Sequence, residues 1–201
     1  MKCVFVTRCS RPDNIKRISE NIESVFRGSR HTYRHVLVCD LTESHEDMKE
    51  YARYDLKAFI QPVIMKHDRD KYLTNGIDTA LFNLNEDGCY VYILDDDNLI
   101  MPEFLDALDE AERTNAVAVV FKVKDHPQWG KSNIEHNKAV GRIDWSSFIT
   151  RIDVMRAIGV YNQFCDSHDS DGEFFNELLD FCDDGEIFYM DKVCGLYNAL
   201  R

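Results

Sequence analysis

YVYILDDDN, residues Tyr90 to Asn98, joins five apolar or aromatic residues to three consecutive aspartates and an asparagine. An apolar run without polar interruptions is typical of a strand that a parallel sheet buries on both faces. The aspartates follow at the point where that strand would leave the core, and their mutual repulsion costs free energy unless a cation lies among them. The sequence therefore predicts a central strand that ends in an acidic turn.

The neighbouring segments alternate between short apolar runs and segments with helical periodicity. Strands are predicted at residues 3–7, 35–40, 58–63, 90–94 and 116–123, and helices at residues 12–28, 46–55 and 73–84 and after Pro102. This alternation predicts an α/β fold with a mainly parallel central sheet and right-handed crossovers. Ligands of such sheets bind at the carboxyl ends of the strands, which is where the acidic turn would lie.

The last third of the chain departs from this alternation. Residues 126–141 are polar and irregular, and so long a loop is typical of a functional flap or a disordered segment. The sequence then predicts an apolar stretch at residues 145–150 and a short helix that ends near Gly159. A strong helix around residues 174–182 and two edge strands, at residues 187–190 and 193–197, complete the prediction.

Composition excludes several classes of protein. The 201 residues, 44% of them hydrophobic, suffice for one domain with a sizeable core. The net charge of −12 repels nucleic acid and anionic lipid, and a diphosphate bound by so acidic a chain would need a divalent cation. No apolar run is long enough to span a bilayer, and Arg8 ends the short N-terminal run that resembles a signal peptide. The seven cysteines form no Cys-x-x-Cys pair, so reduced thiols and a cytoplasmic location are expected.

The acidic turn offers Asp95, Asp96 and Asp97 as ligands. If the strand period of two continues through the turn, Asp95 and Asp97 point to one side and Asp96 to the other. Two carboxylates on one side suit a hard cation such as Mg²⁺ or Mn²⁺, shared with diphosphate oxygens. The alternative interpretation is a solvated acidic turn that binds nothing.

A second acidic cluster, residues 166–173, begins the strong helix. Acidic residues are common at helix starts, where they cap the first turn and interact favourably with the helix dipole. The catalytic alternative is that one carboxylate takes the proton from an acceptor hydroxyl. His168 is then a metal ligand or an alternative base, although a solvated histidine also fits. An EF-hand is excluded, because its first and last ligands would fall on Ser167 and Leu178.

Three motifs in this order resemble the GT-A glycosyltransferases, particularly their family-2-like members. The first motif, residues 91–98 and 102–105, is similar to the family's strand, "DXD" turn and following helix. The second, residues 141–159, is similar to its acceptor-side segment, and the third, residues 171–178, is similar to its "ED" segment. The likeness covers nearly the whole chain. It implies one GT-A domain over residues 1–201, with a nucleotide-sugar-binding half (1–100) and an acceptor-side half (101–201). In its small size the chain is similar to transferases encoded by some large DNA viruses of algae.

The resemblance implies metal-dependent transfer of a hexose from a nucleotide-diphosphate sugar, with a UDP-sugar as the expected donor, to a hydroxyl of a glycan or other acceptor. The implied cofactor is Mn²⁺ or Mg²⁺, with Asp97 as the principal ligand and Asp95 and His168 as further ligands. Asp171 aligns with the base of inverting members, and Asp169 and Glu173 are fallback candidates. Donor-side contacts are implied for Thr7, Arg8, Asp40, Asn75, Asp95, Asp96, Asp97 and Asp144. Within the acidic turn, Asp96 is expected to have a structural role.

Departures from the family pattern leave alternatives open. Thr74 stands where the family often has the arginine of a donor-contacting Arg-Asn pair, and the Gln-x-x-Arg-Trp element of processive enzymes is missing. No glutamate immediately precedes Asp171, so the base and the stereochemical outcome stay open. A sugar nucleotidyltransferase is disfavoured, because the loop Arg8–Pro12 contains no glycine. A nucleotide-sugar-binding module without turnover is the third alternative.

Overall fold

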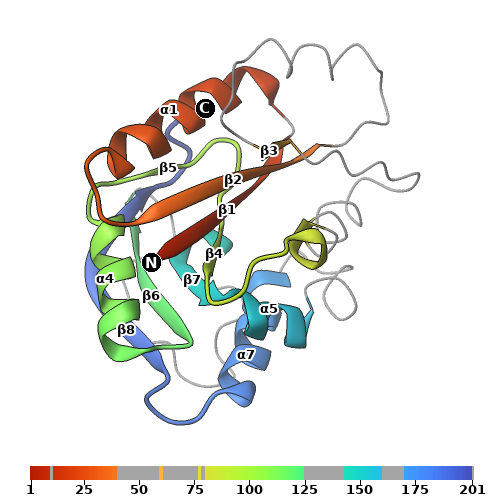
Figure 1. Ribbon diagram of the computed structural model, residues 1–201, viewed down its shortest axis with the longest axis vertical. Helices are drawn as coiled ribbons and strands as arrows, with labels where there is room; N and C mark the ends of the chain where they lie inside the picture. Colours follow the sequence, from red (N-terminus) through yellow and green to blue (C-terminus); the bar gives the residue numbers. More distant parts are fainter. Residues whose placement is uncertain are drawn as a thin grey trace.

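The computed structural model describes residues 1–9, 11–39, 59–60, 77, 80–124, 143–159 and 170–200. In these ranges the chain forms an eight-stranded sheet with helices on both faces (Figure 1). The strands are β1 (Lys2–Cys9), β2 (Thr32–Cys39), β3 (Phe59–Ile60), β4 (Tyr90–Ile93), β5 (Leu99–Ile100), β6 (Ala118–Lys124), β7 (Phe148–Arg151) and β8 (Ile187–Leu196). The helices are α1 (Pro12–Phe26), α4 (Phe104–Thr114), the short 3-10 helix η1 (Trp145–Ser147), α5 (Ile152–Ile158) and α7 (Ser170–Phe181).

The strands follow the order β3-β2-β1-β4-β7-β6-β8-β5 across the sheet. β1 is parallel to both β2 and β4, and β2 is parallel to β3. β7 lies between β4 and β6 and is antiparallel to both, so β4 and β6 run in the same direction, as does β8. Among the described strands only β5 and β7 run the opposite way, which confirms the predicted mainly parallel α/β sheet.

Apolar side chains fill both faces of the sheet, as the alternation along β1 requires. Cys3 and Phe5 face the layer of α1 and α4, whereas Val4 and Val6 face the layer of α5 and α7. The first face holds an aromatic cluster whose ring centroids lie 4.9–5.9 Å apart, formed by Phe5, Tyr92, Phe104 and Phe121. The second face packs Trp145 and Phe148 against Phe174 and Phe175 of α7. Burying each such ring contributes about 1.5–3 kcal/mol, so the strand ends rest on a rigid base.

The C-terminal part differs from the prediction of two edge strands. Residues 187–196 form one strand, β8, which lies between β6 and β5 and not at the edge. The prediction divides this strand because the charged pair Asp191 and Lys192 interrupts its apolar pattern. In the structure these exposed residues fall where the register between β6 and β8 shifts, a bulge that lets charged side chains leave the sheet.

Several sequence predictions fall outside the described residues, among them the helix at residues 46–55 and the polar stretch at residues 126–141. Of the predicted helix at residues 73–84, the structure describes Ile77 and residues 80–84, in which Ile77 and residues 80–83 are helical. The division of the domain into halves at residue 100 stays a prediction. None of the described helices is long and apolar enough to cross a membrane.

Candidate functional site

The acidic turn lies at the carboxyl edge of the sheet, between the ends of β1 and β4. β4 ends at Ile93, and the Asn98 amide donates to the Asp95 carbonyl oxygen at 3.1 Å, closing a tight turn. The strand period of two therefore stops before the aspartates. The prediction that Asp96 faces away from Asp97 is wrong, because the Arg11 guanidinium contacts the carboxylates of both.

Asp96 ties the turn to the start of α1. Its carboxylate accepts hydrogen bonds from the Arg11 backbone amide at 2.5 Å and from Arg11 Nη1 at 2.6 Å. Its carbonyl oxygen accepts from Asn14 Nδ2 at 2.9 Å. A carboxylate at a helix N-terminus is favoured by the helix dipole. Asp96 is 3% exposed, and these contacts fit the structural role expected of it within the turn.

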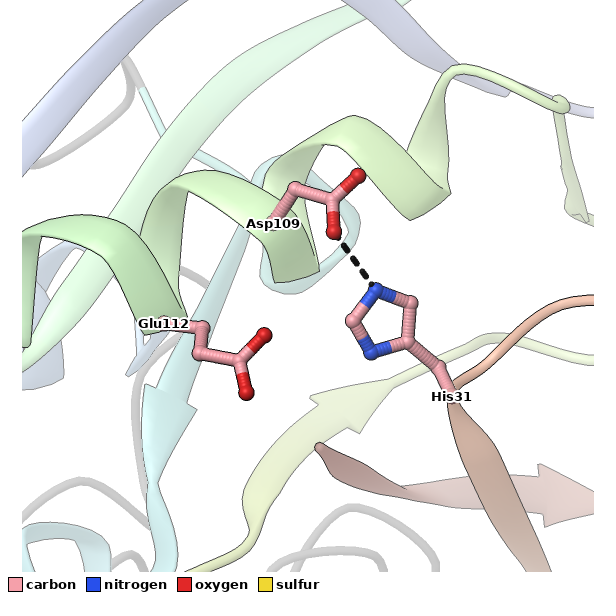
Figure 2. A group of neighbouring side chains, drawn as sticks. All are labelled: His31, Asp109 and Glu112. Carbon is pink, nitrogen blue, oxygen red and sulfur yellow. Dashed lines mark hydrogen bonds and ion pairs between the residues drawn. The ribbon is translucent and has the colours of Figure 1, made fainter.

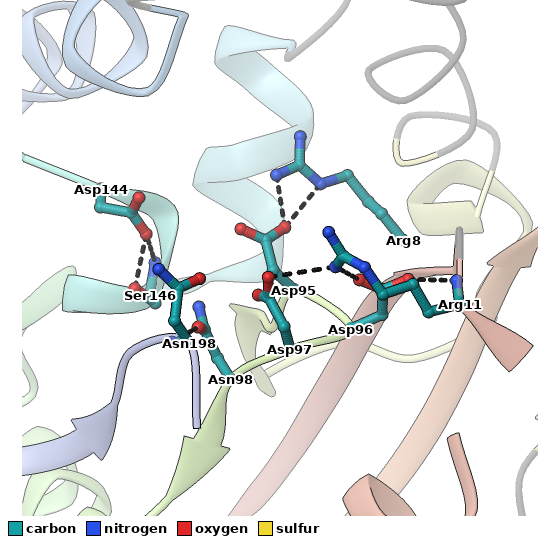
Figure 3. Close-up of polar contacts among 9 residues, drawn as sticks. All are labelled: Arg8, Arg11, Asp95, Asp96, Asp97, Asn98, Asp144, Ser146 and Asn198. Carbon is teal, nitrogen blue, oxygen red and sulfur yellow. Dashed lines mark hydrogen bonds and ion pairs between the residues drawn. The ribbon is translucent and has the colours of Figure 1, made fainter. Parts of the chain in front are cut away.

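Two arginines, Arg8 near the end of β1 and Arg11 just before α1, neutralise the other aspartates of the turn (Figure 3). Arg8 donates from Nε, at 2.9 Å, and from Nη2 to the same oxygen of Asp95. Arg11 Nη1 lies 3.0 Å from Asp97 Oδ2. Burial raises the pKa of Asp95, the Arg8 charge opposes that rise, and the Asp144 charge adds to it.

Asp144 approaches the turn from the other side, at the start of η1 (Figure 3). Its carboxylate accepts from the Ser146 backbone amide at 2.8 Å and from the Ser146 hydroxyl, so it caps the short helix. Residues near the C-terminus also hold the turn. The Asn198 backbone amide donates to Asn98 Oδ1 at 2.9 Å, and the Leu200 backbone amide donates to the Asp97 carbonyl oxygen at 3.1 Å.

Asp171 begins α7 and belongs to the same charge cluster. Its carboxylate accepts from the Gly172 amide at 2.8 Å. Burial and, after it, the charge of Asp144 raise the pKa of Asp171 to about 7, against the smaller opposing effects of the Gly172 amide and Arg8. A carboxyl group with a pKa near neutrality can accept a proton and release it again, as a general base must.

Burial lowers the pKa of the Arg8 guanidinium, and the charges of Asp95, Asp144 and Asp171 outweigh burial, so the net shift is upward. Arg8 thus links the acidic turn to Asp144 and Asp171. Among the described residues, this cluster sets five carboxyl groups (Asp95, Asp96, Asp97, Asp144 and Asp171) against two guanidinium groups. Its oxygen donors are the type that Mg²⁺ and Mn²⁺ prefer, and its excess negative charge fits a divalent cation.

The structure describes two of the remaining predicted site residues, Thr7 and Glu173. Thr7 is fully buried, and its hydroxyl lies 2.9 Å from Nε2 of His35, whose pKa burial lowers to about 4. The Thr7 side chain is thus already engaged beneath the predicted donor site. Glu173 lies in the first turn of α7, two residues beyond Asp171. Four further candidates lie outside the described residues: Asp40, Asn75, His168 and Asp169.

Arg11, Asn14 and Asn198 are site residues to which the sequence analysis assigns no role. Arg8 and Arg11 follow the strand predicted at residues 3–7. In a chain of net charge −12, two arginines so close together indicate a place where acidic groups gather, and this pattern could have pointed to Arg11. The contacts of Asn14 and Asn198 with the turn span 82 and 100 residues, and no local pattern predicts pairs so far apart.

A second group with metal-ligand chemistry lies on the α4 side of the sheet (Figure 2). Potential ligand atoms of His31, Asp109 and Glu112 lie within 4.8 Å of one another. Arg30 Nη2, however, ion-pairs with both carboxylates at 2.6 Å, and His31 Nε2 lies 2.9 Å from Asp109. Arg30 therefore already supplies the cation, and we interpret this group as a structural ion-pair cluster.

This cluster gives a stability prediction. Asp109→Ala removes the partner of the buried His31 Nε2, and an unsatisfied buried polar group costs about 1–3 kcal/mol of unfolding free energy. Glu112→Ala, the matched control, breaks an exposed ion pair with Arg30 and should cost much less, because solvent screens such pairs. Urea unfolding of both variants measures the difference. Equal losses would show that the contact with His31 contributes nothing.

No family model and no curated protein sequence matches the chain. Solved structures do match it. The 1–349 fragment of S. aureus TarS in complex with UDP is similar over 98% of this chain and 60% of its own, at 16% identity and a TM-score of 0.69. The mannosyltransferase PcManGT from Pyrobaculum calidifontis, in complex with GDP-Man and Mn²⁺, is similar over 98% of this chain and 56% of its own, at 14% identity and a TM-score of 0.69.

A third structure, 4-diphosphocytidyl-2C-methyl-D-erythritol synthase from Anaerococcus prevotii, is similar over 100% of this chain and 89% of its own, at 14% identity and a TM-score of 0.56. The chain thus spans 60% of the TarS fragment, 56% of PcManGT and 89% of the synthase. Identities this low establish the fold alone. The chain has the GT-A fold of nucleotide-diphospho-sugar transferases.

Proposed function

We propose that the chain is a metal-dependent glycosyltransferase that moves a hexosyl group from a nucleotide-diphosphate sugar, a UDP-sugar in the first instance, to an acceptor hydroxyl. The observation that carries this proposal is the convergence of the acidic turn, Asp144 and Asp171 around Arg8 at the carboxyl edge of the sheet. In open α/β sheets this edge is where ligands bind. The ligands bound in two structures with this fold, UDP in one and GDP-Man with Mn²⁺ in the other, support the same donor chemistry.

The donor diphosphate would lie against the acidic turn, with Asp97 and Asp95 as the residues that hold a divalent cation. Such a cation stabilises the negative charge that develops on a departing diphosphate. Arg8 and Arg11 partly neutralise the three carboxylates of the turn, which lowers the repulsion that an incoming diphosphate would meet there. The nucleotide and the sugar are proposals by analogy with the fold.

Asp171 is the proposed base. Its carboxylate takes the proton of the acceptor hydroxyl while the acceptor oxygen forms a bond to the anomeric carbon. The bond between that carbon and the diphosphate oxygen breaks, and its electron pair leaves with the nucleoside diphosphate. Attack opposite to the leaving group inverts the anomeric configuration. The raised pKa of Asp171 suits this proton transfer at neutral pH.

The pH dependence of turnover tests this role. Because the base must be ionised, kcat/KM should fall about tenfold per pH unit below an apparent pKa of about 7. Asp144→Asn removes a charge that raises the pKa of Asp171, so the acid limb of the profile should move to lower pH. Glu177→Gln, an exposed residue of the same helix, is the control. An acid limb that stays in place in Asp144→Asn would contradict the assignment.

The proposed function itself is tested by incubating the protein with UDP- and GDP-sugars, with Mn²⁺, Mg²⁺ or a chelator, and measuring release of the nucleoside diphosphate. Slow transfer to water makes the assay independent of the unidentified acceptor. The proposal expects metal-dependent release from at least one donor. Tight metal-dependent donor binding without any release would favour a non-catalytic binding module instead.

A sugar nucleotidyltransferase is the second candidate, because the synthase from Anaerococcus prevotii matches over 89% of its length. This chemistry joins a nucleoside triphosphate to a sugar phosphate and releases pyrophosphate. Arg8 and Arg11 supply positive charge at the end of β1 and in the loop that follows, although the segment Arg8–Pro12 lacks glycine. Pyrophosphate release from UTP or CTP with hexose 1-phosphates therefore forms the second arm of the assay.

A further inference from the structure

Arg11 occupies the position where a cation would meet the buried part of the acidic turn. Its Nη1 lies 2.6 Å from Asp96 Oδ1 and 3.0 Å from Asp97 Oδ2. The two carboxylates are only 4% and 5% exposed, whereas the Arg11 side chain is 44% exposed. The difference in exposure places the guanidinium on the solvent side of Asp97, and Figure 3 shows its contacts with Asp96 and Asp97.

Arg8, by contrast, is held more firmly. Its two hydrogen bonds converge on Asp95, its side chain is 19% exposed, and three carboxylates act on its charge. Arg11 Nη1 contacts Asp97 at 3.0 Å and Asp96 at 2.6 Å. Because the Arg11 side chain is more exposed than that of Arg8, it is the one of the two that can turn toward solvent more easily.

The turn does not depend on the Arg11 side chain for its shape. Asp96 also accepts from the Arg11 backbone amide, its carbonyl accepts from Asn14, and the Leu200 amide holds the Asp97 carbonyl. These contacts remain when the guanidinium leaves. The Asp97 carboxylate can therefore change its cationic partner while the turn keeps its geometry.

We propose that Arg11 is an exchangeable counter-cation: it neutralises Asp97 in the donor-free protein and turns to the donor diphosphate when a divalent cation takes its place. This inference rests on the proposed function. A guanidinium and a divalent cation that share the Asp97 carboxylate repel each other, and this repulsion favours release of the guanidinium. The diphosphate that arrives with the metal offers the displaced guanidinium a bidentate acceptor.

The exchange makes metal binding depend on the nucleotide. Without a diphosphate, a metal ion must displace Arg11 into water, and it binds weakly. With a diphosphate, the displaced side chain gains a partner, so metal and nucleotide strengthen each other's binding by the same factor. Arg11 is thus a positioning residue that keeps the acidic turn from binding metal before the donor arrives.

Mn²⁺ binding followed by electron paramagnetic resonance, with and without UDP or GDP, tests the exchange without any turnover. Arg11→Gln should bind Mn²⁺ alone about tenfold more tightly than wild type, and the enhancement of Mn²⁺ affinity by nucleotide should fall by about tenfold, within the usual range of coupling. Arg11→Lys keeps the charge and should restore much of that enhancement. Lys16→Gln removes a charge from the exposed face of α1, where Lys16 lies 3.8 Å from Glu20, and should change neither value.

Wild-type affinities separate this inference from the proposed function. If wild type shows nucleotide-enhanced Mn²⁺ binding and Arg11→Gln matches it in both values, the exchange is wrong and the metal-dependent function stands. If Arg11→Gln binds Mn²⁺ alone more weakly than wild type, Arg11 supports metal binding and the exchange is also wrong. If wild type binds no Mn²⁺ with either nucleotide, both proposals fail.

Discussion

Asp171→Asn is expected to lower kcat for sugar transfer by about 10²–10⁴-fold, the usual contribution of a general base. Asparagine keeps an oxygen that can accept the Gly172 amide bond, so the start of α7 should be retained. Nucleoside diphosphate affinity should stay within about threefold of wild type, because the base acts on the acceptor and not on the donor. Steady-state kinetics and calorimetry of the variant separate the two effects.

Glu173→Gln is the matched control for this prediction, because Glu173 lies on the same helical turn and is a fallback candidate for the base. It should keep most of the activity. Loss of activity in Glu173→Gln with normal activity in Asp171→Asn would move the catalytic role to Glu173. Loss of nucleotide affinity in Asp171→Asn would instead mark Asp171 as a donor ligand.

The stability of Asp171→Asn gives an independent readout. The pKa of Asp171 in the folded chain, about 7, lies above its ordinary value of 3.8. Its ionisation therefore disfavours folding, and its contribution to stability is lost as pH rises from about 4 through about 7. Asparagine cannot ionise, so relative to wild type the variant should be more stable at pH 8 than at pH 4, as urea unfolding at the two pH values would measure. An equal difference at both values would contradict the raised pKa.

Asp97→Asn is expected to lower metal-dependent turnover by about 10²–10³-fold, the scale of losing one electrostatic contact to developing charge. A neutral amide oxygen remains able to accept from Arg11, but it binds a divalent cation far more weakly than a carboxylate does. Folding should persist, because Asp97 stands among like charges and its backbone carbonyl still accepts from Leu200. Turnover measured over a range of Mn²⁺ concentrations checks this expectation.

Asp106→Asn is the control for Asp97→Asn, since Asp106 is an exposed residue of α4 that pairs with Lys192. It should leave the metal dependence unchanged. Metal-dependent turnover that survives in Asp97→Asn would mean that Asp97 is not the principal ligand.

The central strand and its acidic turn could be predicted because the information is local. An apolar run followed by charges marks a strand and its exit from the core, whatever lies elsewhere in the chain. The same holds for Asp171, since its place at the start of α7 follows from the apolar periodicity of Phe174, Phe175 and Leu178. These predictions concern segments of about ten residues.

The geometry within the turn could not be predicted, because it depends on pairings between distant residues. The strand period fails after Ile93 since a backbone hydrogen bond closes the turn, and Arg11 joins Asp96 and Asp97 across 85 and 86 residues. The insertion of β7 between β4 and β6 depends on tertiary packing in the same way. The single strand β8 could not be predicted either, because the charged residues at its bulge interrupt the apolar pattern as a turn would.

A crystal structure with UDP and Mn²⁺, in which anomalous scattering locates the metal, tests the proposed site most directly. We expect Mn²⁺ bound to an oxygen of Asp97 at about 2.2 Å and to the diphosphate, with the Asp171 carboxylate facing the site of the sugar. Mn²⁺ at the cluster of His31, Asp109 and Glu112 alone, or a nucleotide bound away from the acidic turn, would contradict it.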